Sequence, residues 1–166
     1  MVREDQIGVL IEQEVLEARI KELGEQISRE YAGKELKLVC ILKGGAMFMT
    51  QLAKYITVPV TMDFMILSSY GDALISSGTV HIKKDMDDDI VDTGRALYFL
   101  QDLLKERGAA SVKICTMLDK PARRVSPVQV DYTGFSIDDL YVVGYGLDAA
   151  QYYRNLPYIG YVQLDE

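Results

Sequence analysis

Apolar residues recur along this chain in two patterns, one typical of helices and one typical of buried strands. Residues 11–31 repeat apolar side chains at helical spacing among Glu, Lys and Arg, which predicts an amphipathic helix. The repeating positions are Val15, Ile20, Leu23 and Ile27. Residues 36–42 (LKLVCIL) form a short continuous apolar run, as strands buried in parallel sheets do. The chain therefore begins with a helix that is followed by a buried strand.

The alternation of helices and strands continues to the end of the chain. We expect a helix over 46–56, a strand over 58–67, a polar loop over 68–78, an exposed strand over 79–84, a helix over 93–107, a strand over 111–118, and short strands around 132–135, 141–143 and 159–162. The segment 60–84 reads as one long hairpin. Such alternation indicates a doubly wound α/β fold, with a mainly parallel central sheet flanked by helices. No repeat or linker interrupts it, so we expect one domain over residues 1–166.

Composition narrows the classes of protein to which the chain can belong. Its 166 residues are 49% hydrophobic and 26% charged, which is enough apolar material for a core. No apolar run approaches the roughly 20 residues of a membrane helix, and the charged start argues against a signal peptide. The net charge of −7 leaves no basic face for a nucleic-acid polymer. Cys40 and Cys115 lie in apolar runs and read as buried free thiols, which suits the cytoplasm.

Candidate ligand-binding residues follow three of the expected strands, where doubly wound sheets bind their ligands. Lys43 and Gly44 follow the first buried strand, at a helix start that can face an anion. Residues 88–94 (DDIVDTG) offer a phosphate cradle beside carboxylates for sugar hydroxyls or Mg²⁺. Lys120 can donate to a ligand carbonyl, and it precedes residues 141–148 (YVVGYGLD). Each feature also has an ordinary explanation, namely a tight turn, a helix cap or a core tyrosine.

Taken together, the ordered motifs resemble one enzyme family over nearly the whole chain. SSYG, the DTG loop, LDKP-x-RR, VVGYGLD and YRNLPYIG follow one another as they do in hypoxanthine-guanine phosphoribosyltransferases. The resemblance implies the type I phosphoribosyltransferase fold, with a small hood and a long mobile hairpin. It implies a purine salvage enzyme that transfers 5-phosphoribosyl from phosphoribosyl pyrophosphate to hypoxanthine or guanine, giving IMP or GMP and pyrophosphate. It also implies Mg²⁺ as cofactor and a homodimer or homotetramer.

The resemblance assigns a role to each matching residue. Asp92 is the implied general base, which handles the N7 proton of the purine. The implied substrate contacts are Lys43 and Gly44 with Arg154 (pyrophosphate), Asp88 and Asp89 (ribose), Ile90, Lys120, Tyr141 and Val142 (base), and Thr93, Gly94 and Arg95 (5′-phosphate). Ser69 and Tyr70 match the tip of a lid, which would exclude water from the reacting centre. Asp148 is the implied Mg²⁺ ligand, with Asp88 and Asp89.

The sequence departs from the family just before Asp92. Relatives carry roughly a dozen more residues there, including an apolar strand, whereas residues 83–89 (KKDMDDD) are almost entirely charged. A central parallel strand is mainly apolar, so this run cannot supply one. Either residues are missing from the sequence, which we favour, or the chain has a true deletion and another segment, such as 79–84, has moved into the central position.

Two smaller departures concern single contacts. Ala96 replaces a threonine hydroxyl for the 5′-phosphate, and Leu140 replaces a lysine before the stacking aromatic residue. Together with the short segment before Asp92, they leave open an alternative function. In that alternative the chain is a weakened relative that binds nucleotide or phosphoribosyl pyrophosphate as a sensor. The motifs do not decide whether xanthine is accepted.

Overall fold

The computed structural model describes residues 1–67, 73–75, 78–80, 90–91 and 95–163. In chain order its elements are η1 (Glu4–Gln6), β1 (Ile7–Ile11), α1 (Gln13–Glu30), β2 (Leu36–Leu42), α2 (Ala46–Ala53), β3 (Val60–Leu67), β4 (Ala73–Ile75), β5 (Gly78–Val80), β6 (Ile90–Val91), α3 (Arg95–Glu106), β7 (Cys115–Asp119), η2 (Pro121–Arg123), β8 (Tyr132–Ser136), β9 (Val142–Val143) and β10 (Ile159–Val162). The alternation expected from the sequence is confirmed, and most helices and strands fall within a few residues of their predicted ranges.

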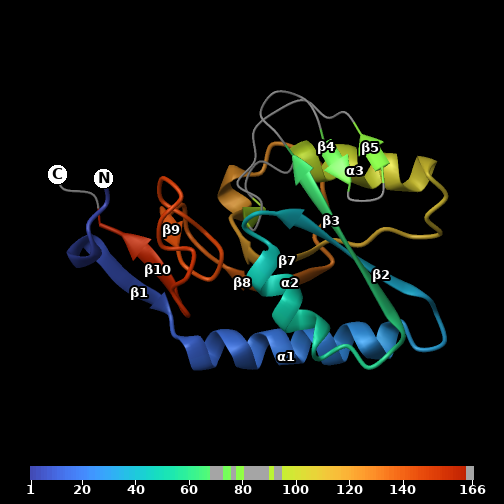
Figure 1. Cartoon of the computed structure of the whole chain (residues 1–166), viewed down its shortest axis with the longest axis horizontal. Helices are drawn as coiled ribbons and strands as arrows, with labels where there is room; N and C mark the ends of the chain where they lie inside the picture. The colour runs from blue at the N-terminus through green and yellow to red at the C-terminus, as the bar shows by residue number, and fades with distance from the viewer. Residues whose placement is uncertain (68–72, 76–77, 81–89, 92–94, 164–166) are drawn as a thin grey trace.

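The strands of the described residues form three ladders, ordered β2-β3-β4-β5, β6-β7-β8 and β1-β10-β9. β2 pairs with β3 in parallel from Leu36 opposite Val60 to Leu42 opposite Ile66. β6, β7 and β8 are also parallel to one another. Figure 1 shows β1, β9 and β10 gathered at one end of the molecule, away from the parallel strands. This antiparallel ladder is the hood, so the structure has a parallel core with a small separate sheet.

Within the described residues, the parallel strands form two ladders, and helices flank them as the predicted doubly wound α/β fold requires. β6 contains only Ile90 and Val91, and among the described residues no hydrogen-bonded pairing joins β6 to β2. The physical reason lies in the sequence, because the run of Lys and Asp at 83–89 offers no apolar strand that could be buried between the two ladders. Residues 83–89 themselves lie outside the described part of the chain, so the expectation that they supply no central strand stays a prediction.

The predicted hairpin differs in its pairing. β3 pairs with β4, which lies in the segment expected to be a polar loop, and β5 pairs with β4 instead of returning along β3. Thr79 and Val80 belong to β5, at the far edge of the β2-β3-β4-β5 ladder. These two residues therefore have not moved into the central position beside β2, and residues 81–84 lie outside the described part.

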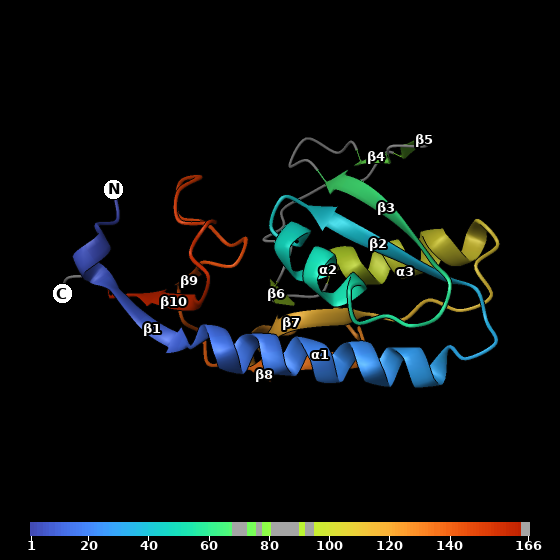
Figure 2. The ribbon, with the colours of Figure 1, turned by 60° about the horizontal axis from the view of Figure 1, so that its bottom comes forward.

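Helices cover both faces of the β2–β3 ladder. Leu16, Ile20, Leu23 and Ile27 of α1 are buried in one core with residues of α2, β2, β7 and β8. On the other side, α3 packs through Leu100 against Ile41 and Met65. The sequence reading of α1 was wrong at Val15, which is 53% exposed, because Leu16 holds the position that continues the buried stripe. Figure 2 shows α1 lying along β7 and β8.

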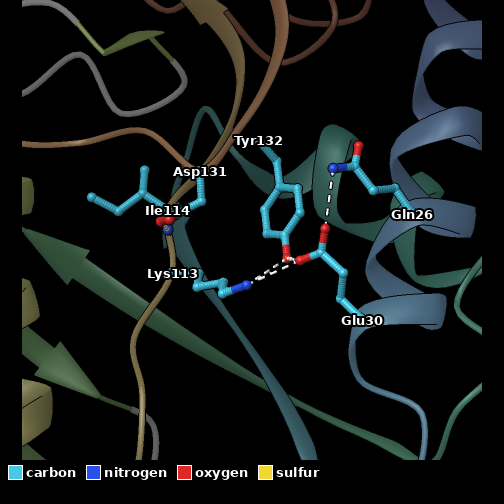
Figure 3. A network of polar contacts seen from close by, with 6 residues as sticks. All are labelled: Gln26, Glu30, Lys113, Ile114, Asp131 and Tyr132. Carbon is cyan, nitrogen blue, oxygen red and sulfur yellow. Dashed lines mark hydrogen bonds and ion pairs between the residues drawn. The ribbon is translucent and has the colours of Figure 1, made fainter.

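Polar contacts fasten α1 to the strands that it covers. Tyr132 of β8 donates a hydrogen bond to the carboxylate of Glu30, and Lys113 Nζ lies 3.0 Å from the same carboxylate (Figure 3). Gln26 Nε2 adds a third donor at 3.2 Å. These hydrogen bonds, led by that of Tyr132, lower the pKa of Glu30 to about 2. Nearer the start of α1, the guanidinium of Arg19 donates to the carbonyl oxygens of Thr133 and Gly134 of β8.

Strand β1 was missed from the sequence, because residues 7–11 follow charged residues and lack the alternation of an exposed strand. In the structure β1 pairs antiparallel with β10, and β10 pairs with β9. Glycines allow the close pairing in this hood. A Cβ atom at Gly8 would lie 2.5 Å from the ring of Tyr161, and one at Gly160 would lie 2.7 Å from Cγ2 of Ile7. The first and last strands of the described chain thus hold each other in place.

Candidate functional site

The first part of the site lies between β2 and α2. Lys43 and Gly44 directly follow β2, and the peptide bond between Leu42 and Lys43 is cis. Gly44 is buried, whereas the Lys43 side chain is exposed. Its Nζ atom donates to Oε1 of Gln151 over 3.1 Å. The turn after β2 therefore points its lysine at a loop more than a hundred residues further along the chain.

That loop, residues 144–156, connects β9 to β10 and contains Asp148 and Arg154. Its conformation is tight, with positive φ angles at Gly144, Tyr145, Gly146, Ala150, Gln151 and Tyr153. Arg154 Nη1 donates to the carbonyl oxygen of Gly146 at 2.6 Å, and Nη2 lies 2.9 Å from Oδ1 of Asp148. The backbone N–H of Gln151 donates to the other carboxylate oxygen of Asp148 at 2.6 Å. The structure thus brings Lys43, Asp148 and Arg154 into one cluster.

The second part of the site is formed by Lys120, at the carboxyl end of β7. This lysine is only 7% exposed, and its Nζ atom donates to the carbonyl oxygen of Leu140 at 2.7 Å. The same Nζ lies 3.5 Å from Oδ1 of Asp139. Arg123 donates to Oδ2 of Asp139 at 3.1 Å, and chiefly this hydrogen bond lowers the pKa of the Asp139 carboxyl. An ammonium group has three N–H donors, so Lys120 can donate a further hydrogen bond beside these two contacts.

Tyr141 and Val142 stand at the entry to β9, directly after the carbonyl group that holds Lys120. Val142 is buried, whereas Tyr141 is 45% exposed and presents a large aromatic surface. The carbonyl oxygen of Tyr141 accepts a hydrogen bond of 2.7 Å from the backbone N–H of Val162 in β10. The structure therefore places an aromatic side chain and a strand backbone within a few residues of the Lys120 contact. A planar ring could stack on such a tyrosine.

Only some of the remaining sequence-predicted site residues lie among the residues that the structure describes. Ile90 lies in β6 opposite Leu118, so the carboxyl end of β6 meets that of β7, where Lys120 follows. Arg95 is the first residue of α3. The other sequence-predicted residues lie outside the described ones, namely Ser69, Tyr70, Asp88, Asp89, Asp92, Thr93 and Gly94. The step between residues 85 and 92, where we considered missing residues, also lies largely outside and stays open.

Two further features bear on the site's chemistry. Among the described residues, no group of three or more His, Cys, Asp and Glu side chains could hold a metal ion by itself. Cys40 is buried and Cys115 is partly buried; both are free, and burial raises the pKa of the Cys115 thiol to about 12. Such a thiol is not a nucleophile near neutral pH.

In the described part of the chain, no helix is both long and apolar enough to cross a membrane.

The sequence did not reveal every residue that takes part. Asp139 and Gln151 bond directly to predicted site residues, yet neither was singled out. Asp139 stands two positions before Tyr141, and Gln151 three positions after Asp148, so proximity to a motif was the only available signal. Their contacts depend on how loops pack against the strand ends, which periodicity does not report.

The family model, the sequence relatives and the solved structures that match this chain all point to one family. Residues 10–150 match the phosphoribosyl transferase domain model. A hypoxanthine-guanine phosphoribosyltransferase of Streptococcus thermophilus (strain CNRZ 1066) is 45% identical, with 96% of this chain and 95% of the relative covered. One from Bacillus subtilis (strain 168) is 43% identical with the same coverage. The crystal structure of a hypoxanthine phosphoribosyltransferase from Staphylococcus aureus matches with a TM-score of 0.83 and 41% identity, covering 95% of this chain and 94% of that chain.

The lengths of these alignments bear on the departure before Asp92. The alignment with the Streptococcus thermophilus relative spans 171 positions, which is more than the 166 residues of this chain. The relative therefore has residues that have no counterpart here. This agrees with the expectation that relatives are longer by an inserted segment, and it leaves open why this sequence is shorter.

Proposed function

This chain belongs to the hypoxanthine-guanine phosphoribosyltransferases, which are pentosyltransferases of purine salvage, and we propose that it carries out the family reaction with the two-part site described above. The substrates are phosphoribosyl pyrophosphate and a 6-oxopurine base, and the products are IMP or GMP and pyrophosphate. The two parts of the site have the chemistry that these two substrates require. One part gathers cations, and the other combines a buried donor with an aromatic surface.

Recognition of the base is assigned to Lys120, Tyr141 and Val142. Lys120 is buried and its ammonium is oriented by the carbonyl oxygen of Leu140, so it can donate to the 6-oxo group of hypoxanthine or guanine. Adenine carries an amino donor at that position and would face a second donor. The exposed ring of Tyr141 stacks on the purine, and the backbone of Val142 contacts its edge. Ile90, at the end of β6, lines the same pocket.

Release of pyrophosphate is assigned to Lys43, Gly44 and Arg154. Glycosyl transfer builds negative charge on the departing pyrophosphate and positive charge on the ribose. Two fixed cations that face the leaving group stabilise the transition state because they need not reorganise during the reaction. The support for this role is that Lys43 and Arg154, which are far apart in sequence, both donate to the same oxygen atom.

A magnesium ion fits the donors at this end of the site. Mg²⁺ bound to a substrate's phosphates commonly takes only one or two protein carboxylates. Asp148 offers one carboxylate beside the two cations, and we assign it as a Mg²⁺ ligand, with Asp88 and Asp89 as further carboxylates from outside the described residues. When bound, the ion would neutralise charge on the departing pyrophosphate.

The residues outside the described ranges, and Arg95 at the start of α3, keep the roles that the family implies. Asp92 is the general base for the N7 proton, and Thr93, Gly94 and Arg95 hold the 5′-phosphate at the start of α3. Ser69 and Tyr70 form the tip of a lid that excludes water from the ribose cation. We further propose that residues 1–166 form one domain, that the chain acts in the cytoplasm and that it assembles as a homodimer or homotetramer. The two free cysteines support a reducing compartment.

The observation that carries the proposal is the convergence of Lys43, Asp148 and Arg154, and the test is an assay of nucleotide formation. Hypoxanthine, guanine, xanthine and adenine are each supplied with phosphoribosyl pyrophosphate and Mg²⁺. We expect nucleotide from hypoxanthine and guanine, with kcat/KM for adenine lower by about 10⁴, because a site built around one hydrogen bond rejects a base that leaves it unpaired. Asp92→Asn serves as the inactive comparison. Equal kcat/KM for adenine and hypoxanthine would contradict the assignment of Lys120.

One observation favours a second candidate function. Within the described residues β6, which directly precedes Asp92, pairs with β7 and has no pairing with β2. A chain of this kind could bind phosphoribosyl pyrophosphate or nucleotide as a sensor with little turnover. The same assay decides between the two, because a sensor would bind phosphoribosyl pyrophosphate in a titration and form no nucleotide from any of the four bases.

A further inference from the structure

Gln151 contacts all three residues of the cluster formed by Lys43, Asp148 and Arg154. Its side-chain oxygen accepts hydrogen bonds from Lys43 Nζ at 3.1 Å and from Arg154 Nη2 at 3.3 Å. Its backbone N–H donates to Asp148 at 2.6 Å. The three partners come from the turn after β2 and from the loop between β9 and β10, three residues before and three residues after Gln151. A single glutamine is therefore the point at which these segments meet.

The backbone of Gln151 is held in an uncommon conformation. Its φ angle is +73°, and Ala150 before it has a φ of +52°. Residues other than glycine rarely adopt this left-handed region, and each such residue costs about 1 kcal/mol or more. The loop accepts this cost at two consecutive positions, and the result is that the amide of Gln151 projects between the two cations while its N–H faces Asp148. This conformation fixes where the side-chain oxygen lies.

The neutrality of the glutamine is as important as its position. Two cations that share one acceptor repel each other, and a neutral oxygen brings them together without cancelling their charge. The amide therefore adds no negative charge to the cluster beyond that of Asp148, which already pairs with Arg154. A carboxylate at the same position would pair with both cations and would compete with any phosphate. The amide oxygen thus occupies the place that one oxygen of an anion would take between Lys43 and Arg154.

We propose that Gln151 is a positioning residue for the pyrophosphate end of the substrate. Its side-chain oxygen holds Lys43 and Arg154 at a common point before the substrate arrives and yields both donors to a pyrophosphate oxygen when it binds. This inference rests on the proposed function, because it takes those two cations as the pyrophosphate contacts. It predicts that the identity of residue 151 sets the affinity for pyrophosphate and leaves affinity for the base unchanged.

Two substitutions separate the charge of residue 151 from its backbone conformation. Gln151→Glu retains the size of the side chain and adds a charge that pairs with both cations. Gln151→Gly removes the amide, and glycine adopts the positive φ without strain, so the loop keeps its shape. Gln51→Glu is the matched control, because half-buried Gln51 also accepts a hydrogen bond from a lysine, Lys54, but it bonds to none of Lys43, Asp148 and Arg154 among the contacts of the described residues. Lys43→Met reports on the cluster itself.

The measurements are the dissociation constant of inorganic pyrophosphate by calorimetry, and KM for phosphoribosyl pyrophosphate and for hypoxanthine. We expect Gln151→Glu to weaken pyrophosphate binding and raise KM for phosphoribosyl pyrophosphate roughly tenfold or more, which is the size of one charge-assisted hydrogen bond. Gln151→Gly should weaken both by a smaller factor. KM for hypoxanthine should stay within about twofold in both variants, and Gln51→Glu should match the parent, since substitutions away from such contacts usually have small effects.

The outcomes distinguish this inference from the proposed function. If Lys43→Met loses pyrophosphate affinity while both Gln151 variants bind like the parent, Gln151 has no positioning role and the proposed function stands. A rise in KM for hypoxanthine equal to that for phosphoribosyl pyrophosphate would indicate general damage to the loop and would also overturn the inference. If the parent chain itself binds no pyrophosphate, the proposed function fails, and the inference fails with it.

Discussion

Lys120 shows at the scale of one residue how burial and function are connected. A lysine is almost never buried unless it is paired, because an isolated charge inside a protein is strongly unfavourable. Here the carbonyl oxygen of Leu140 and the carboxylate of Asp139 compensate the ammonium, and Arg123 holds Asp139 from its other side. Leu140 stands where relatives carry a lysine, yet its backbone oxygen provides the contact. The substitution of that side chain therefore leaves the Lys120 contact intact.

Substitution of this lysine should change base preference more than it changes catalysis on the phosphate side. We expect Lys120→Met to lower kcat/KM for hypoxanthine by about 10–100-fold, the loss of one hydrogen bond from a charged donor, and to leave adenine nearly unaffected. KM for phosphoribosyl pyrophosphate should stay near its original value. Steady-state kinetics with both bases, with Lys54→Met as an exposed-lysine control, makes the comparison. An equal loss for hypoxanthine and adenine would indicate a structural role only.

At the scale of helices and strands, the sequence predicted the elements whose hydrophobic pattern is contained within the segment itself. β2 was predicted at its observed limits, since seven apolar or amphipathic residues between a glycine and a lysine admit few other readings. The pairing of β3 with β4 was not predictable, because β4 is only three apolar residues (ALI) within a Gly- and Ser-rich segment, and its strand conformation depends on its neighbour. Leu16 is buried in α1 where Val15 was expected, and the cause is similar. Only packing decides which of two adjacent apolar residues is buried.

The ties between α1 and the strands make stability depend on pH in a specific way. The folded protein lowers the pKa of Glu30 from 4.5 to about 2, so this carboxylate stabilises the fold above its unfolded value and loses that effect as the pH falls toward 2. We expect Glu30→Gln to lower Tm at pH 7, and the difference from the parent to shrink steadily below about pH 4.5. Thermal unfolding followed by circular dichroism from pH 7 to pH 2 measures it. A difference in Tm between parent and variant that stays constant from pH 7 to pH 2 would exclude the Glu30 carboxylate as the source of that difference.

At the scale of the whole molecule, both ends of the described chain support the strand that we propose to contact the base. β9 carries Val142 and is paired only with β10 among the described residues, while β10 is held from its other side by β1. The sequence could not show this arrangement, because the missed strand β1 lies more than a hundred residues before its partner. The motifs did predict which side chains gather at the site, since Lys43, Asp148 and Arg154 meet as expected. No sequence motif indicated Gln151, the neutral residue that contacts all three.

A substitution in the hood tests this dependence. Gly160→Val would place a side chain against Ile7 and the carbonyl oxygen of Gly8, which lie 2.7 Å and 3.1 Å from the new Cβ atom. We expect a loss of about 1–3 kcal/mol in the free energy of unfolding, as for overpacked sites, and a severalfold rise in KM for hypoxanthine. Val9→Thr, on an exposed position of β1, is the control and should change neither. Unchanged KM in a destabilised Gly160→Val protein would separate the hood from base binding.

The hydrogen bonds of Arg19 have a consequence for how copies of this chain meet in concentrated solution. Among the strands that the structure describes, β8 is an outer strand of the β6-β7-β8 ladder, and an outer strand presents backbone acceptors that can pair with a strand of another molecule. The guanidinium of Arg19 occupies the carbonyl oxygens of two successive residues there, and α1 lies alongside. A helix residue thereby shields a sheet edge from the intermolecular strand pairing that leads to aggregation. The same arginine that fastens α1 to the core thus favours solubility.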